Sequence, residues 1–81
     1  MVLRHFVYAP DPDIATTVAT ALQDAGYVAT VEDTEDAEWL VLVTLEAELI
    51  EPSKSDVMAI AREHGADYDG WEVEHLEDED A

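Results

Sequence analysis

The chain has 81 residues, 48% of them hydrophobic and none of them cysteine, which fits one small globular domain without disulfides or thiolate metal sites. Twenty-one acidic residues against three basic ones give a formal net charge of −18. This charge argues against direct binding to nucleic acid or to an anionic membrane, because both contacts need lysine and arginine to neutralise phosphate.

The first part of the chain predicts a strand, a helix and a second strand. Aromatic and β-branched residues without a breaker predict the first strand at residues 3–9. Asp11 is a favoured helix N-cap and Pro12 suits the first helical position, so we expect a helix to begin there. Apolar residues then recur at helical spacing until Gly26, a natural stop, and residues 27–32 predict the second strand.

The second part predicts a strand, a helix and a final strand. Residues 39–45 are apolar at almost every position, which is typical of a central strand. A second helix follows, capped by either Glu51 or Ser53, and it ends at Gly65. Residues 68–75 alternate apolar or histidine side chains with glutamates, which indicates an edge strand with one solvated face.

The order βαββαβ predicts an α+β fold of the ferredoxin-like type, a four-stranded antiparallel sheet with two helices on one face. This topology places the first and third strands in the centre, and they are the most apolar strands here. We expect residues 1–75 to form this domain and residues 76–81 to form an acidic tail.

The sheet face without helices is expected to carry apolar side chains, namely Phe6, Tyr8, Leu40 and Leu42 or their alternates. An exposed apolar face of this kind is typical of a surface that meets a partner protein or a second copy of the chain.

The sequence predicts no catalytic site, no metal site and no cofactor. His5, His64 and His75 lack the spacing of a zinc-binding helix, and we expect two of them on strands and His64 near a helix C-terminus. Ser53 and Ser55 open a helix and resemble caps more than nucleophiles. The many carboxylates are expected to form a solvated surface, so we predict that the chain is not an enzyme.

A short segment of the last strand has the composition of a binding site. Tyr68 and Trp71 are large amphipathic aromatics that flank Asp69 and the flexible Gly70. Tyrosine and tryptophan are favoured anchors at protein interfaces, and Asp-Gly permits a bulge. Burial of Trp71 in the core is an equally good interpretation, and for Trp39 burial is the better one.

This segment also carries a resemblance to a known family. Residues 64–72 (HGADYDGWE) resemble the signature of the RraB family, the regulators of ribonuclease activity B, which inhibit ribonuclease E. Residues 6–8, 21–27 and 39–43 are similar to the family's first strand, first helix end and third strand, so the resemblance spans residues 5–75.

The resemblance implies a ferredoxin-like sandwich that restrains RNA degradation through protein–protein contact, with a ribonuclease E-like enzyme as partner. We therefore predict a non-enzymatic regulatory protein that binds no nucleic acid directly. The residues expected to bind the partner are Tyr8, Tyr68, Asp69, Gly70, Trp71 and Glu72.

Two other functions stay open on the sequence. One is a small-ligand sensor that dimerises, as many ferredoxin-like domains do, and binds a metabolite between its copies. The other is an isomerase built as a dimeric barrel, with His5 or Tyr8 in catalysis. The sequence shows no nucleophile–base pair that would support the enzyme interpretation.

The acidity has two interpretations, steering toward a basic partner and adaptation to a salt-rich cell interior. The even spread of acid and the near absence of lysine favour a halophilic source. The chain shows no signal segment and no run near the ~20 apolar residues of a membrane span, so we expect it in the cytoplasm.

Overall fold

The computed structural model describes residues 2–34 and 37–74. Six elements follow one another as β1 (Val2–Ala9), α1 (Pro12–Asp24), β2 (Val28–Asp33), β3 (Trp39–Glu46), α2 (Ser53–Glu63) and β4 (Asp67–Glu74). The expectations for His75 and for the acidic tail at residues 76–81 lie outside the described residues.

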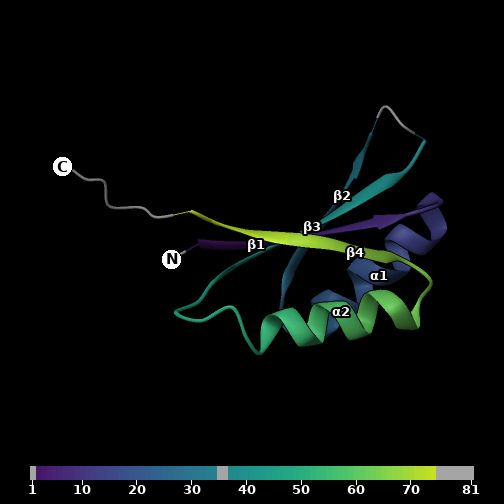
Figure 1. The fold of residues 1–81 in the computed structure, drawn as a ribbon. Helices are drawn as coiled ribbons and strands as arrows, with labels where there is room; N and C mark the ends of the chain where they lie inside the picture. The colour runs from purple at the N-terminus through teal and green to yellow at the C-terminus, as the bar shows by residue number, and fades with distance from the viewer. Residues whose placement is uncertain (1, 35–36, 75–81) are drawn as a thin grey trace.

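The four strands form one antiparallel sheet in the order β2-β3-β1-β4, and both helices lie against the same face of it (Figure 1). The predicted ferredoxin-like α+β fold is confirmed, with β1 and β3 in the centre of the sheet. These two strands are central because their side chains on the helix side are apolar or uncharged and can be buried between the layers.

The core lies between the sheet and the two helices. From β1 it takes Leu3, Val7 and Ala9, which are fully buried together with His5, whereas the alternate side chains Arg4, Phe6 and Tyr8 are only half-buried. The helices contribute buried aliphatic side chains at helical spacing, which are Val18 and Leu22 from α1 and Val57 and Ala61 from α2. Each buried valine or leucine contributes about 1.5–3 kcal/mol to the free energy of unfolding relative to an exposed one. The buried side chains therefore hold the helices against the sheet.

The helix ends explain where the connections turn. The Asp11 carboxylate accepts a hydrogen bond from the Ile14 N–H at 2.8 Å, which caps α1 as predicted. Gly26 follows α1 with a φ of +99°, a conformation that glycine adopts without strain. At α2, Glu51 rather than Ser53 bonds the first turn, because its Oε1 accepts from the N–H and the hydroxyl of Ser55, both at 2.9 Å.

Candidate partner-binding surface

The sheet has one face turned away from the helices, which we call the open face. Residues that are paired across antiparallel strands point to the same side, so the register identifies its members. They are Val2, Arg4, Phe6 and Tyr8 of β1, Val28, Thr30 and Glu32 of β2, Leu40, Leu42, Thr44 and Glu46 of β3, and Asp67, Gly70, Glu72 and Glu74 of β4.

The centre of the open face is apolar. Phe6 lies opposite Leu42 and Tyr8 lies opposite Leu40, and all four side chains are half-buried. Val28 on the edge strand β2 is 64% exposed. The sequence prediction that Phe6, Tyr8, Leu40 and Leu42 lie on the helix-free face is therefore confirmed.

Gly70 keeps Phe6 accessible from the β4 side. It lies opposite Phe6 and has a φ of +145°, and a Cβ built on it would have no atom within 4 Å. Since Gly70 has no side chain, it adds no cover to this flank of the half-buried aromatic ring.

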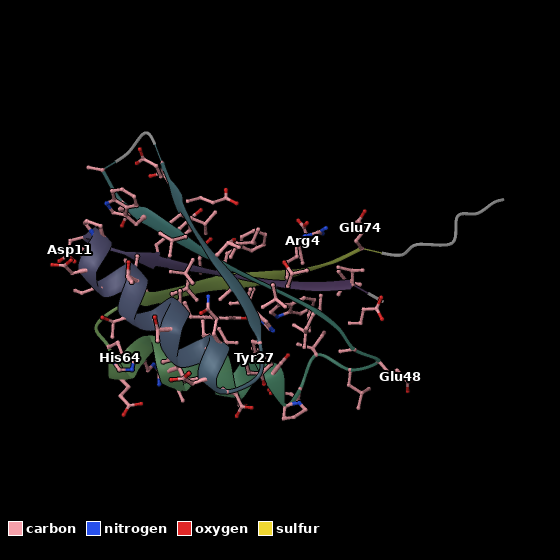
Figure 2. All side chains as sticks on the ribbon, turned by 180° about the vertical axis from the view of Figure 1, so that it is seen from behind. Arg4, Asp11, Tyr27, Glu48, His64 and Glu74 are labelled. Atoms are coloured by element: carbon pink, nitrogen blue, oxygen red, sulfur yellow. The ribbon has the colours of Figure 1, made fainter. Side chains whose placement is uncertain are left out.

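Carboxylates surround the apolar centre, and two of them hold an arginine. Arg4 Nη1 lies 3.3 Å from Glu72 Oε2 and Arg4 Nη2 lies 2.7 Å from Glu74 Oε1. Figure 2 shows Arg4 and Glu74 side by side, away from the helices. The pKa of Arg4 is raised, chiefly by its hydrogen bond to Glu74. Arg4 is the cation of the open face in the part of the chain that the structure describes, since Lys54 and Arg62 lie in α2.

The six predicted binding residues do not share one face. The register of β4 shifts between Phe6 and Val7, so that Tyr68 opposes Val7 and Gly70 opposes Phe6. Tyr8, Gly70 and Glu72 lie on the open face. Tyr68 and Trp71 point to the helix side, and Asp69 is exposed at the shift in register.

Tyr68 belongs to a buried polar network that sequence reasoning missed. Its hydroxyl lies 2.8 Å from His5 Nδ1, and His5 Nε2 lies 2.9 Å from Ser53 Oγ. His5 is fully buried and Ser53 is 4% exposed. The strict alternation of β1 places His5 in the buried row with Leu3 and Val7, and that alternation is the signal that could have revealed its burial.

The network fixes the proton positions on His5. The Ser53 hydroxyl donates to the Ile50 carbonyl at 2.8 Å, so it accepts from His5 Nε2–H, and His5 Nδ1 then accepts from the Tyr68 hydroxyl. Burial lowers the pKa of His5, and the neutral ring satisfies both partners. His5 is thus a donor to Ser53 and not its base, so this contact is not an activated nucleophile.

Trp71 is partly free, unlike Tyr68. It lies opposite His5 on the helix side of the edge strand and is 41% exposed. The sequence left core and surface as equal interpretations for Trp71, and the structure places Trp71 among the exposed large hydrophobic side chains. Tyr68 packs against the core cluster.

Residues 2–34 and 37–74 contain no group of three or more histidine, aspartate or glutamate side chains that could hold a metal ion, and they form no pocket. None of the helices described is long and apolar enough to cross a membrane. Among the described residues, exposed large hydrophobic side chains lie on the open face at Val28, at Trp71, and at Leu49 in the connection between β3 and α2.

One known family matches most of the chain. The model of the family named regulator of ribonuclease activity B matches residues 1–73, which extend from β1 into β4. The chain belongs to the RraB family. The resemblance that the sequence showed is confirmed, and the RraB match includes the network around His5 and every open-face residue except Glu74. A search of curated proteins gives no match.

Proposed function

We propose that this RraB-family chain is a non-enzymatic regulatory protein of the cytoplasm. It binds a ribonuclease E-like enzyme and reduces RNA degradation through that contact. The family match supports a role in regulating ribonuclease activity. The observation that carries the proposal is the apolar centre of the open face on a chain of net charge −18.

The charge favours action on the enzyme and not on its RNA substrate. Glu32, Glu46, Glu72 and Glu74 lie around the apolar centre and repel phosphates. Apolar side chains at the centre with charged groups around them match the usual anatomy of a protein–protein interface. The regulator would therefore change RNA turnover by occupying a surface of the ribonuclease.

The test measures cleavage of a fluorescent RNA by the full-length ribonuclease E-like enzyme of the same organism, with and without the purified chain. We expect slower cleavage in its presence, direct binding between the two proteins by calorimetry, and no shift of the RNA alone. Unchanged cleavage together with no heat of binding, at the salt concentration of the cell, would refute the proposed function.

A further inference from the structure

We propose that the open face receives a basic amphipathic segment of a protein partner. The apolar side chains of that segment would lie on Phe6 and Leu42, and its arginine or lysine side chains would bind the carboxylate pair Glu72 and Glu74. This inference rests on the proposed function and specifies the chemistry that the partner presents.

The apolar centre of the open face lies on the two central strands. Phe6 and Leu42 are cross-strand neighbours on the two central strands, so they lie in the middle of the open face. Val28 is a further apolar residue of this face on the edge strand β2, where it lies opposite Thr44 and is 64% exposed. Gly70, the residue opposite Phe6 on β4, has no side chain to lie beside the Phe6 ring. An apolar side chain of a partner can therefore approach Phe6 and Leu42 directly.

The charged half follows from Arg4. The guanidinium of Arg4 bridges Glu72 and Glu74, which demonstrates that this pair accepts a guanidinium. The Glu72 and Glu74 side chains are still 56% and 51% exposed, so both keep oxygen atoms open to a second cation. Arg4 thus occupies in the free protein a position that a partner's arginine can share or take over.

The same charges argue against two other occupants. A second copy would bring its own Glu32, Glu46, Glu72 and Glu74 against these four, and a chain of charge −18 resists such pairing. Aromatic side chains on an open four-stranded sheet can stack on RNA bases, but here the surrounding carboxylates repel the phosphates. A segment that is both basic and apolar can bind the carboxylates of the open face and also cover its apolar centre.

The first experiment uses a fluorescent peptide of about 15 residues that alternates leucine with arginine, and a second peptide with glutamate in place of arginine. Anisotropy at about 0.15 M salt gives the affinity. We expect only the arginine peptide to bind, and the E72Q/E74Q variant to bind it about fivefold to tenfold more weakly. The matched control is D24N/E63Q, which removes two exposed carboxylates from the helices and should change the affinity much less.

A substitution of Arg4 is expected to have the opposite effect on peptide affinity. Replacing it by glutamine (R4Q) frees the carboxylate pair, so we expect the arginine peptide to bind about threefold more tightly. R62Q is the control, because it changes the net charge equally from the exposed surface of α2. Equal effects of R4Q and R62Q would overturn the proposed site, as would equal effects of E72Q/E74Q and D24N/E63Q. All these side chains are outside the core, so the variants are expected to stay folded.

The last experiment separates this inference from the proposed function. Binding of the ribonuclease is measured with F6A, L42A and W71A, each checked for folding by circular dichroism. Loss of binding in F6A and L42A but not in W71A supports the open face. The reverse pattern overturns the open face and leaves the proposed function standing, whereas no binding by the unaltered chain refutes the function itself. A dimer that L42A dissociates, or tight binding of a single-stranded RNA, would also overturn the inference.

Discussion

His5 is expected to remain neutral at a pH where an exposed histidine is already protonated. Burial is the main cause of its lowered pKa, and the smaller effects of Glu51, which raises it, and Lys54, which lowers it, oppose each other. The folded pKa is below the ordinary value of 6.5, so the unfolded chain takes up this proton first as pH falls. The contribution of His5 to stability is therefore complete above that value and decreases below it.

This prediction is tested by chemical denaturation between about pH 7 and about pH 5.5, where histidine is the main group to titrate. The free energy of unfolding should fall as pH falls, and the slope should be smaller in H5Q. In parallel, ¹⁵N spectra of the histidine rings should show His5 protonated on Nε2 alone at about pH 7 and doubly protonated only at a lower pH than an exposed histidine. A His5 ring that becomes doubly protonated at or above its ordinary pKa would contradict the network described here.

At the scale of the elements, the sequence predicted more of the fold than of the surface. The apolar run of β3, the alternation of β1 and the cap signals at Asp11 and Gly26 depend on neighbours in the chain, and these features were read correctly. The network of His5, Ser53 and Tyr68 joins residues 48 and 63 positions apart, and the ion pair of Arg4 with Glu72 spans 68 positions. Such contacts exist only once the strands have paired, and no local pattern contains them.

The first helix depends on its cap in a way that can be measured. Replacing Asp11 by alanine removes the 2.8 Å bond to the Ile14 N–H, which should lower the free energy of unfolding by about 1 kcal/mol. For a domain of this size the melting temperature should fall by about 4–8 °C. D13A is the control, because Asp13 lies in the same first turn without being the cap. If both variants melt alike, the cap is not what stabilises the start of α1.

At the scale of the whole molecule, repulsion among like charges is expected to oppose folding. Twenty-one acidic residues face three basic ones, and salt shortens the range over which they repel, from about 30 Å at 0.01 M to about 3 Å at 1 M. We therefore expect the melting temperature to rise with KCl, most steeply at low salt. Circular dichroism melts in a KCl series test this, and a variant with several surface glutamates changed to glutamine should respond less. Full stability that is independent of salt would remove the proposed adaptation to saline conditions.

The shift in register of β4 connects an exposed side chain, Trp71, with the buried network around His5. Three positions separate Tyr68 from Trp71, and an unbroken strand would send them to opposite sides. The extra residue brings both onto the side of the helices, where one ring is bonded to His5 and the other is partly in solvent. A molecule that binds Trp71 therefore contacts the strand that also carries Tyr68. The Tyr68 hydroxyl is hydrogen-bonded to His5, and His5 is hydrogen-bonded to Ser53 in the first turn of α2, so binding at Trp71 is connected to that helix.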